Sequence, residues 1–196
     1  PLHQPLAVLG QPRTGIPGSF NSYQEYQSYI DTLIRTHSIT DARQIRYDIM
    51  PHHRFSTLVI RICDMLPNIN DTLAVTALIQ ATIAWMVHLR EHNMRFRLYE
   101  RLLIAENKWR AVRYGLEGEL IDWGIEQMVP APDLIRELLA FVAPFAEQLN
   151  SNEEVAHIET ILARGANARQ QVQSWQSTGQ DIKAVVDFII DETAQV

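Results

Sequence analysis

The chain has 196 residues, of which 46% are hydrophobic, and this is enough for a sizeable core in one domain spanning 1–196. Its 17 lysines and arginines against 23 acidic residues give a net charge of -6, which argues against a nucleic-acid binder that neutralises phosphates. Cys63 is the only cysteine, so no internal disulfide can form and a reducing, cytoplasmic compartment is expected. No apolar run approaches the roughly 20 residues of a membrane span and we expect no signal sequence, so no membrane association is predicted.

The N-terminal stretch 1–20 is rich in proline and glycine and has little periodicity, which predicts a loop. A helical pattern begins at Asn21, where Ser22 is a candidate N-cap and Glu25 can complete a capping box. Apolar residues at helical spacing carry this pattern to about His37. The sequence therefore predicts a first helix over 22–37.

The segment 44–64 alternates with a period of two at both ends, which predicts two short strands joined by the loop 51–56. Each strand should have one apolar and one mixed face; the apolar faces are Ile45, Tyr47 and Ile49 in the first strand and Leu58, Ile60 and Ile62 in the second. If the strands pair as a simple hairpin about this loop, Asp48 faces Val59 and Arg46 faces Arg61. Two facing guanidinium groups would then seat a phosphate or a carboxylate. The alternative is that another strand separates the two.

After Pro67 the sequence is mainly helical. Asn70 or Asp71 can cap a helix whose apolar stripe runs to Leu89, and its low charge predicts burial on most sides. Further helices are predicted over 95–114 (ended by Gly115), 133–149 (interrupted at Pro144), 153–164 (ended by Gly165), 166–177 (ended by Gly179) and 181–193, with a glycine-rich loop holding Trp123 and Pro130 after the first. The fold class is therefore α+β, helix-rich with a small piece of sheet.

One helical face is the strongest candidate for chemistry. Asn107, Arg110 and Tyr114 share a face of the helix 95–114, and Arg113 borders it. Guanidinium groups suit phosphate or carboxylate binding, although a cationic last turn that complements the helix dipole needs no ligand. The adjacent pair at 52–53 and the pair at 88 and 92 are histidines that could bind metal. However, adjacent histidines point in different directions, and a pair one helical turn apart is more often a solvated helix end.

Four segments, in order, carry a resemblance to a known family: 13–17 (Arg-Thr-Gly-Ile-Pro), 47–52 (Tyr-Asp-Ile-Met-Pro-His), 55–64 (Phe-Ser-Thr-Leu-Val-Ile-Arg-Ile-Cys-Asp) and 107–116. Together they resemble the carboxylate-amine ligases of the glutamate-cysteine ligase type 2 group. The resemblance runs from about residue 12 to about residue 171. It corresponds to the C-terminal half of a usual family member, whose N-terminal half carries a Gly-x-Glu-x-Glu-type acidic strand.

The resemblance implies an ATP-dependent ligation in which the side-chain carboxylate of glutamate takes the terminal phosphoryl group and an amine attacks the acyl phosphate. It also implies Mg²⁺ held by acidic side chains and a glutamine-synthetase-like curved antiparallel sheet that includes the strand pair. The positions that match the family motifs are Asp48 and Arg61 as catalytic residues, and Asp64, Asn107, Arg110, Arg113 and Tyr114 as substrate or ATP contacts.

Two positions depart from the family pattern. Met50 stands where the family has arginine, and Val59 stands where it has a metal-binding glutamate, and neither side chain can hold a cation or a phosphate. The sequence thus allows a ligase part completed by an N-terminal half, a subunit or a second copy, or a degenerate homologue that binds without catalysis. A helical interaction module is a third hypothesis. Because two isolated strands leave open edges, we expect a homo-oligomer or a complex with an N-terminal half.

Overall fold

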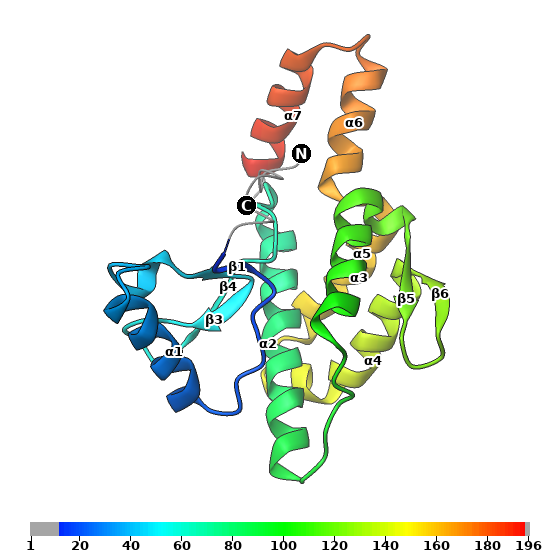
Figure 1. The fold of residues 1–196 in the computed structure, drawn as a ribbon. Helices are drawn as coiled ribbons and strands as arrows, with labels where there is room; N and C mark the ends of the chain where they lie inside the picture. Colours follow the sequence, from blue (N-terminus) through cyan, green and yellow to red (C-terminus); the bar gives the residue numbers. More distant parts are fainter. Residues whose placement is uncertain (1–11, 195–196) are drawn as a thin grey trace. The chain divides into compact units, whose positions relative to one another are not determined.

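The computed structural model of the chain describes residues 12–194 and divides into two compact units, residues 1–65 and 66–196 (Figure 1). Each unit is considered by itself, and the prediction of one domain over 1–196 stays a prediction. The predicted loop over 1–20 lies outside the described residues for positions 1–11. Within positions 12–20 the structure adds a short strand, β1 (Thr14–Gly15).

Helix α1 (Tyr23–Arg35) begins as the sequence predicts. The Ser22 hydroxyl oxygen accepts a hydrogen bond from the Glu25 backbone N–H at 3.1 Å, which satisfies one of the free donors of the first turn. The Glu25 carboxylate accepts from the Asn21 backbone N–H at 2.7 Å, so the reciprocal bond closes one residue earlier than in a standard capping box. The predicted first helix is therefore confirmed, ending at Arg35.

The segment predicted to form two strands contains three short strands, and β1 adds a fourth. β1 pairs in parallel with β2 (Arg46–Tyr47), and β3 (Ile49–Pro51) pairs antiparallel with β4 (Leu58–Ile60). The single first strand predicted from the alternation is thus divided at Asp48, where the backbone bends. The predicted antiparallel strand pair is confirmed as β3 and β4.

The register of this pair differs from the predicted one. Met50 lies opposite Val59, and the Arg61 backbone N–H donates to the Asp48 carbonyl oxygen at 2.7 Å. The prediction that placed Arg46 opposite Arg61 is therefore wrong. The reason is the turn: the His52 backbone N–H donates to the Thr57 carbonyl oxygen at 2.8 Å, so the pairing continues two positions further along the first strand than expected.

The His52 side chain holds this turn together. Its Nδ1 accepts hydrogen bonds from the backbone N–H groups of Arg54 at 3.1 Å and Phe55 at 3.0 Å, and its ring stacks on the Phe55 ring with centroids 4.9 Å apart. An imidazole that accepts from two backbone donors in its own loop acts as Asn or Asp does in a tight turn. His52 thus has a structural use that the sequence analysis did not consider.

The bend at Asp48 also changes which residues are buried. Before it, Ile45 and Tyr47 are buried as predicted, whereas after it Met50 is buried and Ile49 is exposed. The predicted apolar face of the second strand is wrong at Leu58 and Ile62, which are exposed. A bend between two strands shifts the phase of an alternation of period two, so one pattern cannot describe both sides of it. The core of this unit comprises Tyr26, Ile30, Ile39, Ile45, Tyr47 and Met50.

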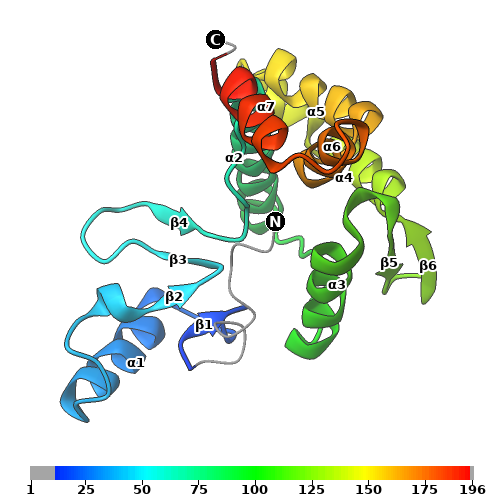
Figure 2. The ribbon, with the colours of Figure 1, turned by 90° about the horizontal axis from the view of Figure 1, so that it is seen from above.

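The second unit is mainly helical, as predicted. Its elements are α2 (Ile69–Glu91), α3 (Arg101–Tyr114), β5 (Glu119–Asp122), β6 (Gln127–Pro130), α4 (Ala131–Gln148), α5 (Asn152–Arg164), α6 (Asn167–Ser177) and α7 (Ile182–Ala194) (Figures 1 and 2). Within this unit α2 packs against α4 and α5, and α6 pairs with α7. Together with the short strand pairs, these helices confirm the helix-rich α+β class, whereas the relation of the strands to a glutamine-synthetase-like sheet stays a prediction.

Several boundaries in this unit correct the sequence analysis. The N-cap of α2 is Asn68, whose side-chain oxygen accepts from the Asn70 backbone N–H at 2.9 Å, and not Asn70 or Asp71. Helix α3 starts at Arg101 instead of position 95. The predicted glycine-rich loop is largely the hairpin β5–β6, and α4 continues through Pro144 without a break.

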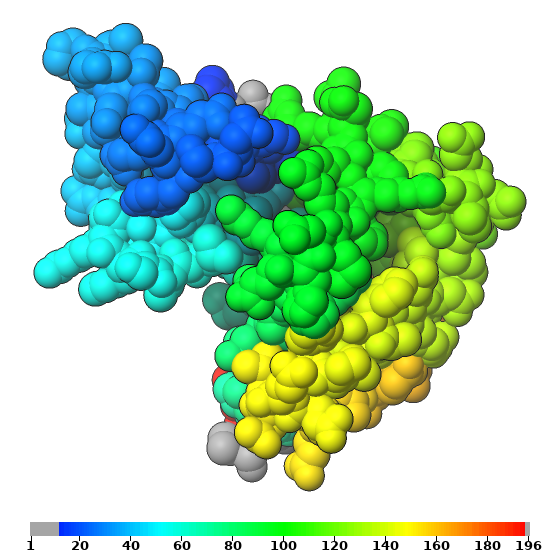
Figure 3. Space-filling model, turned by 90° about the horizontal axis from the view of Figure 1, so that it is seen from below, coloured from blue at the N-terminus to red at the C-terminus, as the bar shows by residue number. Residues whose placement is uncertain are grey.

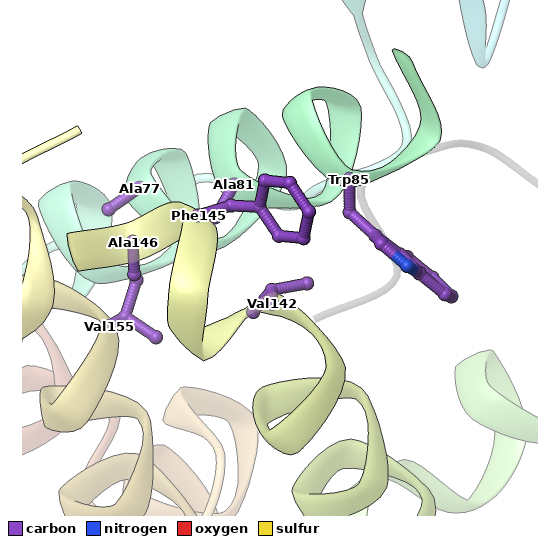
Figure 4. Packing of buried hydrophobic residues seen from close by; sticks show 7 residues of the cluster. All are labelled: Ala77, Ala81, Trp85, Val142, Phe145, Ala146 and Val155. Carbon is purple, nitrogen blue, oxygen red and sulfur yellow. The ribbon is translucent and has the colours of Figure 1, made fainter. Parts of the chain in front are cut away.

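The core of the second unit lies between α2, α4 and α5. It comprises Ala77, Ala81, Trp85, Val142, Phe145, Ala146 and Val155, which Figure 4 shows gathered between these helices. Trp85 also stacks on Phe141 with ring centroids 5.1 Å apart. Small alanines on α2 let the helix α4 approach closely, while the aromatic rings fill the remaining space.

Among residues 12–194, helix α2 is long and apolar enough to cross a membrane by length and composition. The expectation that no apolar run reaches this length is therefore wrong by that criterion. Threonine and glutamine interrupt the run of apolar residues in α2, but they add no charge and leave its mean hydropathy high. A core helix of a soluble protein passes the same test, and one side of α2 packs on α4 and α5. That the protein binds no membrane stays a prediction.

Candidate active-site residues

The hairpin β3–β4 brings the four family positions of the first unit to one face. Met50 lies opposite Val59, and Asp48 lies opposite Arg61 at the next pair of that face. Residues that face each other in an antiparallel pair project to the same side, and positions two apart along a strand do so as well. The register therefore places Asp48 and Arg61, which match the motifs of the resemblance, in one patch with Met50 and Val59, which depart from them.

These four side chains are buried to very different degrees. Asp48 is 5% exposed and Met50 is 8% exposed, whereas Arg61 lies at the surface. Met50 belongs to the core that includes Tyr26, and Val59 packs against that core. At the two positions where the resemblance implies arginine and glutamate, this chain therefore uses apolar side chains for packing, and Arg61 is the most exposed member of the patch.

Asp64 ends this unit at an exposed position. Its Oδ1 accepts a hydrogen bond from the neighbouring Met65 backbone N–H at 2.8 Å, which forms a local turn. Beside it, desolvation by surrounding protein atoms raises the pKa of the Cys63 thiol even though part of that side chain is exposed. A raised pKa lowers the thiolate fraction at neutral pH, which does not favour a nucleophilic role for Cys63.

The arginine-rich helix α3 lies at the surface of the second unit, where its green atoms are visible in Figure 3. The Arg110 Nε donates to the Glu106 carboxylate at 3.0 Å, one helical turn earlier. The Arg113 guanidinium lies 5.7 Å from the centroid of the Tyr114 ring, and that ring meets the Trp109 ring edge-on at 5.8 Å. Arg113, Tyr114 and Trp109 thus form an exposed cationic and aromatic group, a combination that favours planar anionic ligands.

Trp109 is the residue of this group that sequence analysis assigned to packing. It is half exposed in the structure, as is Tyr114. Their distance of five positions does not place them on one face of an ideal helix, so helical spacing gave no signal for the contact. Tyr114 is the last residue of α3, and Gly115, which has a φ of 63°, ends the helix directly after it.

Asn107, in contrast, is used by the fold. Its Nδ2 donates to the Ile121 carbonyl oxygen at 2.8 Å, and its Oδ1 accepts from the Ile121 backbone N–H at 2.8 Å. This pair of bonds ties the middle of α3 to strand β5. The role of Asn107 as a substrate or ATP contact stays a prediction, but its amide already has two protein partners.

We expect Asn107→Ala to lower the unfolding free energy by about 1–3 kcal/mol, because two buried backbone groups of Ile121 lose their partner. Asn107→Asp is the matched control: it keeps the acceptor for the Ile121 N–H and loses the donor, so its loss should be smaller. Urea unfolding followed by circular dichroism measures both. A variant that kept full stability and lost ATP affinity would show that the amide serves a ligand instead.

A cluster of charges that the sequence did not predict lies at the start of α2. Asp71 is 3% exposed, its Oδ1 contacts the His157 Nε2 at 2.9 Å, and its Oδ2 accepts from the Arg164 Nη2. Both partners belong to α5. From the sequence Asp71 was predicted only as a candidate helix cap. Its two partners are separated from it by 86 and 93 positions along the chain, so these contacts leave no local signal in the sequence.

Metal ligands are not gathered in the part of the chain that the structure describes. Among residues 12–194 no group of three or more histidine, cysteine, aspartate or glutamate side chains could hold a metal ion. The ring centroids of the histidine pair at 52 and 53 lie 4.3 Å apart and those of the pair at 88 and 92 lie 4.0 Å apart, with the rings tilted in both pairs. Both pairs therefore lack the further ligand that a site would need.

Comparison with known proteins decides which family these features belong to. The model of the family described as glutamate-cysteine ligase family 2 matches residues 9–187 of the chain. The chain belongs to this family. The resemblance inferred from the four sequence segments is therefore confirmed.

Curated relatives agree with this assignment. A protein of Solibacter usitatus is 47% identical over 182 residues, which cover 93% of this chain and 47% of the relative. Proteins of Herpetosiphon aurantiacus and Sorangium cellulosum are each 43% identical and cover 94% and 93% of this chain and 48% of their own length. All three carry the name "Putative glutamate--cysteine ligase 2". The family and these names support a function like that of a glutamate-cysteine ligase, and the chain spans about half the length of these relatives.

Proposed function

We propose that this chain is part of an ATP-dependent carboxylate-amine ligase of the glutamate-cysteine ligase type. In that reaction a carboxylate oxygen of glutamate attacks the terminal phosphorus of ATP and ADP leaves; the nitrogen of an amine then attacks the acyl phosphate and phosphate leaves. The observation that carries the proposal is the register of β3–β4, which sets Asp48 opposite Arg61 on the face that holds the other family positions.

Three guanidinium groups are the proposed binding elements: Arg61 and Arg113 are exposed, whereas Arg110 is partly buried and pairs with Glu106. Arg61 in the first unit, and Arg110 with Arg113 in the second, offer the paired donors that carboxylates and phosphates accept. Tyr114 adds a hydroxyl group and an aromatic ring beside Arg113. Asp48 and Asp64 are proposed as supporting acidic residues, and the glutamate-like substrate and the amine are the proposed small-molecule partners.

The Mg²⁺ that the family implies does not fit the described residues. They contain no cluster of three ligating side chains, and Val59 occupies the position of the family's metal-binding glutamate. We therefore assign no step to a metal held by this chain. Preorganised electrostatic groups each contribute about 100- to 1,000-fold to rate, so without the groups replaced at Met50 and Val59 the chain by itself should not ligate. A complex with the half that it does not cover is the proposed active form.

A second function is favoured by the burial of Met50. A side chain that belongs to the core of the first unit is specialised for packing, and a return to arginine there would bury a charge. In this second function the chain is a non-catalytic homologue, and the patch of Asp48, Met50, Val59 and Arg61 binds a nucleotide, an amino acid or a partner protein. Both functions share the binding role of Arg61 and differ in turnover.

Binding of Mg-ATP by calorimetry tests the shared part. We expect Arg61→Ala to weaken binding by about 10- to 100-fold, the value of a hydrogen bond to a charged group. Arg43→Ala is the matched control in the same unit, because it removes an exposed guanidinium that lies outside the four family segments. The Arg43 side chain donates a hydrogen bond to Asp41, which lowers the pKa of Asp41 to about 2. Equal affinities of the two variants, or no binding by the unaltered chain, would count against the proposal.

A further inference from the structure

Helix α7 carries an apolar stripe that no other described segment covers. Ile182 is 71% exposed, Val186 is 50% exposed and Ile190 is 58% exposed, and their spacing of four places them along one side of the helix. A neighbouring side of α7 is the one that packs: Val185 is buried, and the Ser174 hydroxyl of α6 donates to the Ala184 carbonyl oxygen at 3.5 Å. In Figures 1 and 2, α6 and α7 run side by side within the second unit.

Three charged residues lie beside this stripe. Lys183, Asp187 and Asp191 each follow a stripe residue by one position, so they form a second row along one flank. None of these three side chains forms an ion pair with any residue in the range 12–194. The row is unequal, with a cation at the N-terminal end and two acids toward the C-terminal end.

We propose that α7 pairs with α7 of a second copy of this chain, antiparallel and with the two-fold axis at Val186. In this arrangement Ile182 lies beside Ile190 of the partner subunit, and the Val186 side chains meet at the axis. The flanking rows then lie on the same side, so Lys183 falls between Asp187 of the partner subunit and Asp191 of the partner subunit. Each Lys183 thus meets two acids of the other subunit, whereas Asp187 meets one like charge, Asp187 of the partner subunit, beside the axis, so attraction outweighs repulsion across this isologous interface.

The charge pattern selects this orientation. In a parallel pairing about a two-fold axis the two charged rows would lie on opposite sides of the contact, so Lys183 would not meet the acids of the other row and this attraction would be lost. A helix of 13 residues is about 20 Å long, and its stripe offers less than the roughly 800 Å² per partner of a standard interface. The association should therefore be weak, concentration-dependent and more sensitive to salt than an apolar contact alone.

Sedimentation equilibrium of the full chain over a concentration series, with circular dichroism to check folding, tests the contact. The unaltered chain should dimerise, and Val186→Asp should weaken dimerisation by at least about tenfold, because it places two acids at the axis. Leu102→Asp is the matched control, since it alters an apolar residue of α3 that is equally accessible and should leave the dimer unchanged.

A charge exchange tests the orientation. Lys183→Glu alone, and Asp187→Lys with Asp191→Lys alone, should each be monomeric because every cross-subunit pair becomes repulsive. An equimolar mixture of the two variants should dimerise again, since all pairs are then attractive in the mixed dimer. A monomeric unaltered chain, a dimer that Val186→Asp leaves intact, or a mixture that stays monomeric would overturn the proposal, and the last would indicate that another partner covers the stripe.

Discussion

Replacing Asp71 by asparagine is expected to lower the unfolding free energy of the second unit by about 3 kcal/mol, which corresponds to a fall in melting temperature of roughly 10 °C. The carboxylate is buried and accepts from both His157 and Arg164 of α5. Without it, the Arg164 charge loses its counter-ion while its Nε is already buried without a partner among the described residues. The figure is at the low end of the range for buried pairs because the two partners are 28% and 30% exposed.

Thermal unfolding monitored by circular dichroism measures this loss, since most helices belong to the second unit. Asp133→Asn is the matched control: it removes an acid that pairs with Arg136 at 3.4 Å, but both side chains are at least half exposed. Exposed ion pairs contribute about 0–1 kcal/mol, so the control should shift the melting temperature little. Equal shifts for the two variants would show that the buried cluster does not hold α2 to α5.

The largest expected effect on activity concerns Val59. In a chimera in which this chain replaces the corresponding half of the Solibacter usitatus relative, we expect Val59→Glu to raise the rate of ligation by about 100- to 1,000-fold. The substitution restores the carboxylate that the family pattern has at this position. Val59 is half-buried at the margin of the core, so a glutamate there can extend toward solvent, whereas Met50 lies within the core.

Val59→Gln is the matched control for size and polarity, because it differs from glutamate only in charge. Formation of glutamyl hydroxamate from glutamate, ATP and hydroxylamine measures the rate in both chimeras. We expect the glutamine variant to stay at the level of the unaltered chimera. A rise of the same size in both variants would mean that polarity or packing, and not a restored charge, limits the reaction.

The sequence predicted those features that depend on neighbours along the chain. The Ser22 cap, the stops at Gly115 and Gly165, and the helices from α4 to α7 follow from local hydrogen bonding and from the conformational freedom of glycine. The family motifs were equally visible, because they are contiguous segments. These parts of the account needed no knowledge of tertiary contacts.

What the sequence could not predict depends on contacts between distant residues. The turn closed by His52 sets the register of β3–β4, and the bend at Asp48 reverses the phase of burial, so Met50 is buried and Ile49 is not. Asn107 was assigned to a ligand because it shares a helical face with Arg110, but its amide bonds to β5. The contacts of Asp71 with α5 have no local signal at all.

We propose that this chain binds the substrates of a ligase and does not catalyse the ligation by itself. The direct measurement is an assay for ADP and glutamyl hydroxamate with the purified chain alone, under conditions in which Mg-ATP binding is saturated. The account predicts no product above the background without protein. Product that the chain forms by itself, and that Arg61→Ala abolishes, would contradict it.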